Sequence, residues 1–145
     1  MLFKNEESSL KLDIVTYEFP ADGGDPTSDD RNWLVLRCTW TEEDNVTKDS
    51  NSCLLTYELR EMTAGLKVLN AGIKDEYASS FVEPYFELAA QTNGDDTFQV
   101  AVSFYLPNSM DGNDTAEIEC TMTKEEMTEL IRELDKLCEK FPDRT

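Results

Sequence analysis

Residues 116–141, AEIECTMTKEEMTELIRELDKLCEKF, decide the fold, because the hydrophobic period changes once within them. Up to residue 122 apolar and polar residues alternate, which places Ile118 and Met122 on one face of a strand. Thr123 and Glu126 then form a capping-box pattern, in which each side chain bonds the other's backbone N–H. The stretch therefore predicts a strand that runs directly into a helix.

The predicted helix is amphipathic and ends before Pro142. Its apolar side chains share one face, and they are Met127, Leu130, Ile131, Leu134, Leu137, Cys138 and Phe141. A partner-binding or coiled-coil surface is an alternative use of such a stripe, but the stripe is short for a coiled coil. We therefore expect the helix to pack against the protein's own sheet.

Upstream of this stretch the chain alternates again. Residues 98–106 give the clearest strand pattern, and residues 85–92 form a similar run before them. The link between the two runs contains Asn93-Gly94, a dipeptide typical of a tight hairpin. The short link between the two runs therefore favours antiparallel strands.

A second helix is expected to begin at Thr56. The hydroxyl of Thr56 can accept a hydrogen bond from a free N–H of the first turn, and Glu58 suits the positive start of a helix. Gly65 weakens the interior, and Gly72 is expected to end the helix. The apolar residues that recur at helical spacing are Leu59, Met62, Leu66, Leu69 and Ile73.

The first part of the chain predicts strands at residues 10–19, 33–40 and, with a weaker pattern, 46–55. Residues 1–9 are expected to form a flexible N-terminus. The whole chain, residues 1–145, is then expected to be a single α+β domain. Its predicted architecture is a mostly antiparallel sheet of five or six strands with two helices, in the order β-β-(β)-α-β-β-β-α.

The composition favours a binding protein over an enzyme. The chain has 31 acidic and 13 basic residues, a net charge of −18, and no histidine. It therefore lacks the side chain most used for proton transfer near neutral pH. The negative charge favours a cationic partner and repels nucleic acid and anionic membranes, although high charge can also serve solubility alone. Without a signal peptide or a long apolar run, we expect a cytoplasmic protein.

Two acidic segments flank the strand at residues 33–40. Asp29 and Asp30 precede it, and Glu42, Glu43 and Asp44 follow it. A cationic partner would be steered to such carboxylates, so these five residues are the candidate partner-binding residues. The alternative is that both segments are solvated turns.

No catalytic residue, metal ligand or cofactor is expected. Glu117 and Glu119 share a strand face, as the two acids of a glycosidase do, but such pairs arise by coincidence among so many carboxylates. The loops at residues 22–25 and 111–114 are candidate calcium ligands, but neither matches an EF-hand and turn chemistry explains both.

Zinc binding is an alternative for the cysteines, which have no closely spaced pair. We expect them to be free thiols in a reducing compartment.

Five short motifs occur in order along residues 12–144, and together they resemble the WapI-type immunity protein family of bacteria. The motifs are Phe19-Pro20, Asn32-Trp33-Leu34, Cys53-Leu54-Leu55-Thr56-Tyr57-Glu58-Leu59, Glu83-Pro84-Tyr85-Phe86 and Phe141-Pro142-Asp143-Arg144. Being mostly apolar or capping, they are interpreted as scaffold. The resemblance implies a small cytoplasmic protein that binds and silences a polymorphic toxin, and the toxin of the family's namesake carries a nuclease domain acting on tRNA.

An acidic immunity protein suits a nuclease toxin, because carboxylates can mimic the phosphates that a cationic nuclease surface holds. Partner choice is then expected to lie in the segments 21–31 and 41–52. The alternative is a general acidic interaction or regulatory module that binds another cationic protein. In either case we expect a monomer or weak homodimer.

Overall fold

The computed structural model describes residues 1–25, 27–108 and 114–144. In chain order its elements are β1 (Leu2–Lys4), β2 (Ser8–Tyr17), the 3-10 turn η1 (Asp29–Asn32), β3 (Trp33–Glu42), β4 (Asn45–Leu55), α1 (Thr56–Asn70), β5 (Glu76–Ala78), β6 (Phe86–Thr92), β7 (Thr97–Leu106), β8 (Asp114–Thr123) and α2 (Lys124–Lys140). The strands form two four-stranded antiparallel sheets, which we name sheet A (β1-β2-β3-β4) and sheet B (β5-β6-β7-β8).

The predicted α+β class and the two helices are confirmed, but the expected sheet of five or six strands is wrong in number and arrangement. The described residues contain eight strands in two sheets. The two unforeseen strands, β1 and β5, are three residues long and so too short to produce an alternating pattern. The weakly predicted strand at residues 46–55 is present as β4.

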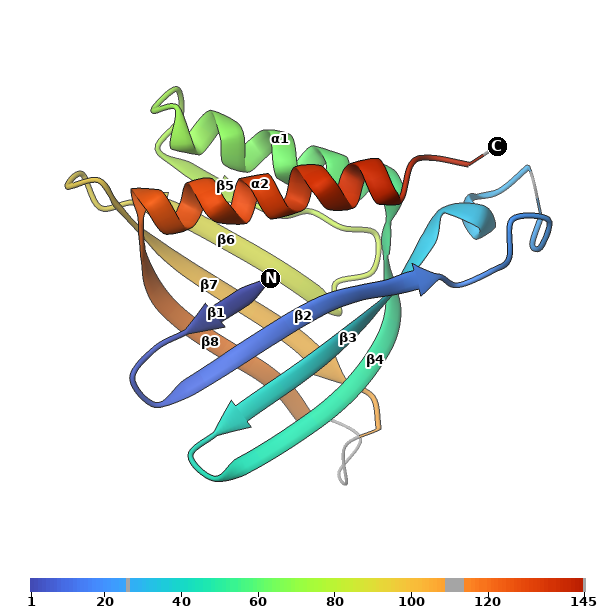
Figure 1. Cartoon of the computed structure of the whole chain (residues 1–145), viewed down its shortest axis with the longest axis horizontal. Coiled ribbons are helices and arrows are strands. Elements are labelled where there is room, and N and C mark those ends of the chain that lie inside the picture. Colours follow the sequence, from blue (N-terminus) through green and yellow to red (C-terminus); the bar gives the residue numbers. More distant parts are fainter. Residues whose placement is uncertain (26, 109–113, 145) are drawn as a thin grey trace.

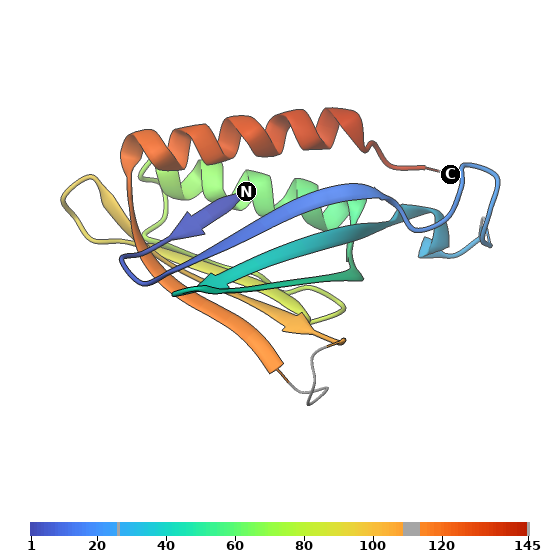
Figure 2. The same cartoon turned by 60° about the horizontal axis from the view of Figure 1, so that its bottom comes forward.

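The helices lie side by side and form one layer over the two sheets (Figure 1). Strands of sheet A cross those of sheet B in this view, and turning the molecule shows both helices on the same side of the sheets (Figure 2). Each sheet is therefore left with one face turned away from the other elements. Within the described residues, no helix is both long enough and apolar enough to cross a membrane.

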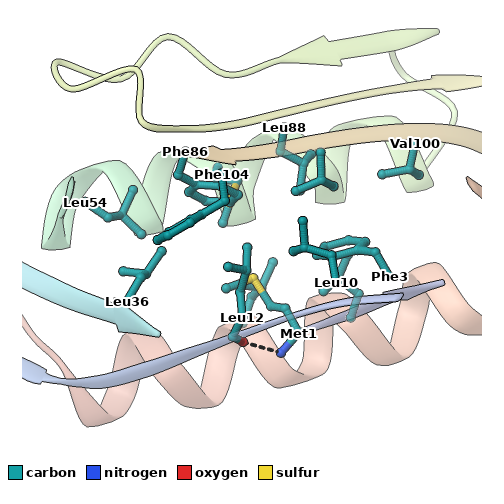
Figure 3. Close-up of a cluster of buried hydrophobic side chains, with 14 of the residues drawn as sticks. Met1, Phe3, Leu10, Leu12, Leu36, Leu54, Phe86, Leu88, Val100 and Phe104 are labelled. Atoms are coloured by element: carbon teal, nitrogen blue, oxygen red, sulfur yellow. Dashed lines mark hydrogen bonds between the residues drawn. The ribbon is translucent and has the colours of Figure 1, made fainter. Parts of the chain in front are cut away.

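One hydrophobic core joins both sheets and both helices. Leu10 and Leu12 of β2 face Leu88 of β6 and Phe104 of β7 across the space between the sheets (Figure 3). All four side chains are at most 1% exposed, and full burial of such a side chain contributes about 1.5–3 kcal/mol. The alternation predicted for residues 98–106 is confirmed, because every second residue of β7 enters this core.

The segment of residues 1–9, expected to be flexible, contains β1 and the start of β2. Phe3 pairs with Leu10 across the two strands, and the side chains of Met1 and Phe3 are buried in the core. Its flexibility is a statement about motion and stays a prediction.

The start of α1 differs from the expectation that Thr56 is its N-cap. Leu55 occupies that position, and Thr56 is the first helical residue. The hydroxyl of Thr56 instead donates to Oδ1 of Asn32 (3.2 Å), and the free N–H of Leu55 is bonded by the carboxylate of Glu58 (3.0 Å). The threonine hydroxyl therefore bonds a side chain distant in sequence, and the buried carboxylate of Glu58 takes over the bond at the start of the helix.

The other helix ends follow the sequence closely. Gly72 adopts a left-handed φ of 75° just after α1, as expected of a C-terminal cap, although Ile73 lies beyond the helix and is 74% exposed. At α2 the capping box is present: Oγ1 of Thr123 accepts from the N–H of Glu126 (3.1 Å), and Oε1 of Glu126 accepts from the N–H of Thr123 (3.0 Å). Local signals therefore decided these boundaries.

Candidate partner-binding surface

The five predicted partner-binding residues lie in two groups at opposite ends of β3. Asp29 and Asp30 belong to η1, which precedes the strand, while Glu42 ends it and Glu43 and Asp44 form the turn to β4. A strand of ten residues spans about 30 Å, so the two groups do not form one patch. Their part in binding stays a prediction for each group separately.

The carboxylates of η1 are engaged within their own neighbourhood. Oδ2 of Asp30 accepts from the backbone N–H of Asp25 (3.0 Å), and Oδ2 of Asp29 accepts from the hydroxyl of Tyr57 (3.4 Å). Hydrogen bonds from Thr27 hold the pKa of Asp25 below its usual value. This loop is therefore shaped by internal bonds, as its turn-forming residues predict.

Four of the five motifs behind the family resemblance meet at one point beside this loop. Oδ1 of Asn32 accepts from the backbone N–H of Arg144 (2.6 Å) and from the hydroxyl of Thr56. The Arg144 side chain donates to the carbonyl of Phe19 (3.1 Å) and places its guanidinium 3.3 Å from the centre of the Tyr17 ring. These residues fasten the end of the chain to η1 and α1, which agrees with their interpretation as scaffold.

The fifth motif, Glu83-Pro84-Tyr85-Phe86, is also tied to α1, through the residue before it. Oε2 of the buried Glu58 carboxylate accepts from the backbone N–H of Val82 (2.8 Å). This bond fixes the segment that enters β6, and with it Tyr85, which is 41% exposed. The motifs therefore position a surface at the entry to sheet B.

The outward side chains of sheet B form rows that run across its strands and face solvent. In register across β6, β7 and β8, Glu87 lies beside Ser103 and Glu117, while Ala89 lies beside Ala101 and Glu119. We name the hollow on this face the acidic trough, and the residues that define it are Ala78, Glu87, Ala89, Ala101, Ser103, Glu117 and Glu119.

The acidic trough is hollow because its floor is made of small side chains. Ala89, Ala101 and Ser103 reach little beyond the backbone, and the space above them amounts to about 450 Å³. Glu119 is oriented by Nε2 of Gln99, which donates to its Oε1 (3.0 Å). Among the described residues, no lysine or arginine lies on the outward positions of β6, β7 and β8.

A pair of tyrosines stands at one end of the trough. Tyr85 and Tyr105 lie next to the row of Glu87, with ring centres 5.3 Å apart and ring planes inclined by 35°. Tyrosine combines a large apolar ring with a polar tip, and it is enriched among the residues that dominate interface energies. The trough thus carries both charge and aromatic area.

Glu117 also lines a second hollow, of about 450 Å³, whose residues come from both sheets. They are Trp40, Glu42, Thr47, Leu106, Asp114, Thr115 and Glu117. Of the five predicted residues, Glu42 lines this hollow and so shares it with one carboxylate of the trough. Sequence reasoning missed Glu87, and it weighed Glu117 and Glu119 only as a glycosidase-like pair, which it set aside. The three could not be grouped because strand register across the sheet cannot be read from alternation alone.

The outward face of sheet A has the opposite charge. Lys11 and Lys48 flank Thr39 across three strands, and Arg37 lies opposite Asp13 in the strand register. Asp13 forms an ion pair with Lys11 (3.9 Å). Its central part therefore carries three cations and one carboxylate, whereas the charged side chains that line the acidic trough are all carboxylates. One cation, Lys74, lines the adjoining hollow over Ala89, Ala101 and Glu119. The net negative charge of the chain is thus unevenly divided between the two sheet faces.

The geometry gives little support to a glycosidase pair, to a metal site or to reactive thiols. Glu117 and Glu119 occupy successive outward positions of one exposed strand, not the two sides of a cleft. The described residues contain no group of three or more cysteine, aspartate or glutamate side chains placed to hold a metal ion. The calcium candidate at residues 111–114 lies outside the described residues except for Asp114. Burial raises the pKa of Cys38 and of Cys53 to about 12, which keeps these thiols neutral.

Comparison with family models gives a match that covers most of the chain. The model of the immunity protein WapI-like family matches residues 1–142. No curated protein matches the sequence. Two solved structures from Arabidopsis thaliana are similar at a TM-score of 0.47: WHY1, with 14% identity over 97% of this chain and 83% of that one, and WHY3, with 13% identity over 97% and 86%. At these values neither likeness carries information about function.

Proposed function

The chain belongs to the immunity protein WapI-like family, and on that premise we propose that it neutralises a cognate toxin, namely a basic toxin of nuclease type. The family implies a non-enzymatic protein that works by binding. We propose that neutralisation consists of covering the toxin's nucleic-acid-binding surface, so that substrate is excluded for as long as the complex lasts.

The observation that carries the finer proposal is the charge. A nuclease must hold phosphates, which requires a cationic surface, and this chain has a net charge of −18. Carboxylates on a folded surface attract the same cationic groups and raise the rate of encounter. An acidic protein is therefore suited to occupy the site where the nucleic acid would lie.

The second candidate function is that of a general acidic interaction or regulatory module for another cationic protein. It is favoured by the position of the carboxylates, which occur at both ends of β3 and on sheet B. The two functions differ in affinity, because toxin neutralisation requires a long-lived complex with fully buried anchor residues. Binding that stays weak and unselective among basic proteins would favour this second function.

Growth rescue tests the proposed function. The basic C-terminal domain of a candidate toxin, chosen from the genes that neighbour this chain's gene, is expressed in cells from an inducible promoter, with and without this protein. We expect growth to be restored by this protein and not by an unrelated acidic protein of similar charge. Continued growth arrest despite abundant folded protein would refute the proposal.

Salt dependence tests the electrostatic part of the proposal. Raising the salt concentration from about 0.05 to 0.5 M shortens the Debye length to a few ångströms. We expect the association rate with the toxin domain to fall strongly over this range, while the dissociation rate changes less. An association rate indifferent to salt would contradict steering by charge and leave the family function standing.

A further inference from the structure

We propose that the acidic trough of sheet B is the surface that receives the toxin, and that a lysine- or arginine-bearing segment of the toxin lies along its floor. This inference rests on the proposed function and adds the location of the binding surface. It is a departure from the sequence-based expectation, which placed binding in the turns at the two ends of β3.

Charge selects sheet B over sheet A. A basic toxin approaching the central face of sheet A meets Lys11, Arg37 and Lys48, which repel it. The same toxin approaching sheet B meets Glu87, Glu117 and Glu119 with no cation among the outward positions described for β6, β7 and β8. Like charges placed opposite each other in an interface are costly, so the two faces differ strongly in their fitness for such a partner.

Shape supports the same face. The methyl groups of Ala89 and Ala101 form an apolar strip along the floor, and carboxylates stand on its flanks. Lysine and arginine have apolar stems and charged heads, so a stem can cover the alanines while the head reaches a carboxylate. A trough of about 450 Å³ has room for more than one such side chain.

Two groups of residues near the trough add to the surface that a partner could contact. Tyr85 and Tyr105 add aromatic area at one end, and Glu42 continues the negative charge into the neighbouring hollow beside Trp40. A stable protein complex buries about 800 Å² on each partner, which requires more than the trough itself. In the proposed complex these neighbours supply part of the remaining contact area.

A second copy of this chain is a poorer occupant. Two acidic troughs facing each other would repel, and a trough resting on the cationic face of sheet A would be a head-to-tail contact, which gives a ring or an open filament and not a two-fold dimer. Oligomeric state is therefore included as an outcome of the test below.

Two matched tyrosine substitutions test the location. Ala101→Tyr fills the centre of the trough, and Thr39→Tyr makes the same addition at the centre of the outer face of sheet A. Both positions lie on central strands, where tyrosine is well tolerated. Affinity for the purified toxin domain is measured by titration calorimetry, and thermal unfolding verifies that each variant is folded.

A second pair of variants tests the charge without adding bulk. Glu87→Gln, Glu117→Gln and Glu119→Gln are combined in one protein. The control combines Glu18→Gln, Glu61→Gln and Glu139→Gln, which change the net charge equally at exposed positions away from the trough. This pair keeps the inference testable if Ala101→Tyr does not fold.

We expect Ala101→Tyr and the trough triple variant to weaken binding about tenfold or more, and both controls to stay within about threefold of the unsubstituted protein. Equal binding by trough and control variants would overturn the inference while leaving the proposed function intact. Failure of the unsubstituted protein to bind would instead refute the proposed function. Concentration-dependent self-association that Ala101→Tyr abolishes would overturn the inference in favour of a second copy as occupant.

Discussion

Glu58 is expected to be the most costly carboxylate to remove from this chain. Its side chain is 3% exposed, and its two oxygens accept from the backbone N–H groups of Leu55 (3.0 Å) and Val82 (2.8 Å). The first bond satisfies the start of α1, and the second holds the segment that leads to the tyrosines beside the acidic trough. The substitution Glu58→Ala leaves both N–H groups without this acceptor.

The magnitude follows from these two bonds. A hydrogen bond to a charged group contributes about 1.5–3 kcal/mol, and a carboxylate near a helix start adds about 0.3–1 kcal/mol. We therefore expect Glu58→Ala to lower the free energy of unfolding by about 3–7 kcal/mol. Glu58→Gln retains one acceptor oxygen but turns an amide donor toward the other N–H, so it is expected to cost about 1.5–3 kcal/mol.

Urea unfolding followed by circular dichroism measures this difference. Glu61→Ala on the same helix is the control, because Glu61 is exposed and its substitution is expected to change the free energy by less than about 0.5 kcal/mol. If Glu58→Ala unfolds at the same urea concentration as the control, the buried carboxylate does not stabilise the junction and the reasoning is wrong.

Three further substitutions or conditions give separate tests. Gly65→Ala would bring a methyl group into a clash with the Tyr77 ring, so thermal unfolding should show a loss of about 1–3 kcal/mol despite the better helix propensity of alanine. Burial raises the pKa of Cys38 and Cys53 to about 12, so the stability they contribute is complete below about pH 8.5 and should decline toward pH 12 in urea titrations. Asn32→Ala removes an acceptor that fastens the end of the chain, and should raise hydrogen-exchange rates there and cost about 1–3 kcal/mol.

Each of these tests has a contrary outcome. A stabilised Gly65→Ala protein would mean that the Tyr77 ring moves aside at no cost. A free energy of unfolding that stays flat or rises between pH 9 and 11 would contradict neutral, buried thiols at Cys38 and Cys53. Unchanged exchange rates near Arg144 in the Asn32→Ala protein would mean that other bonds suffice to hold the end of the chain.

Local patterns were sufficient for α2 and β7 but not for β4. The capping box at Thr123 and the strict alternation of β7 depend on residues close in sequence, and both were predicted correctly. In β4 an inward position is taken by Asp49, whose carboxylate is buried where the pattern would require an apolar side chain. Asn108 satisfies this carboxylate through its backbone N–H (2.8 Å) and Nδ2 (2.7 Å), and such a distant partner cannot be foreseen from alternation.

The candidate surface shows the same limit. Alternation in β8 correctly placed Glu117 and Glu119 on the outward face. Their association with Glu87 and with the alanine floor depends on the register of three strands, which the sequence alone does not specify. Conversely, Asp30 and Glu42 both flank β3 in sequence but lie at opposite ends of it in space.

An inhibition titration tests the central claim most directly. The purified toxin domain is assayed for its activity on nucleic acid while this protein is added in increasing amounts at low salt. We predict that activity falls to zero at one molecule of this protein per toxin, and that the Ala101→Tyr protein requires a large excess whereas Thr39→Tyr does not. Toxin activity that persists in the presence of excess folded protein would contradict neutralisation by binding.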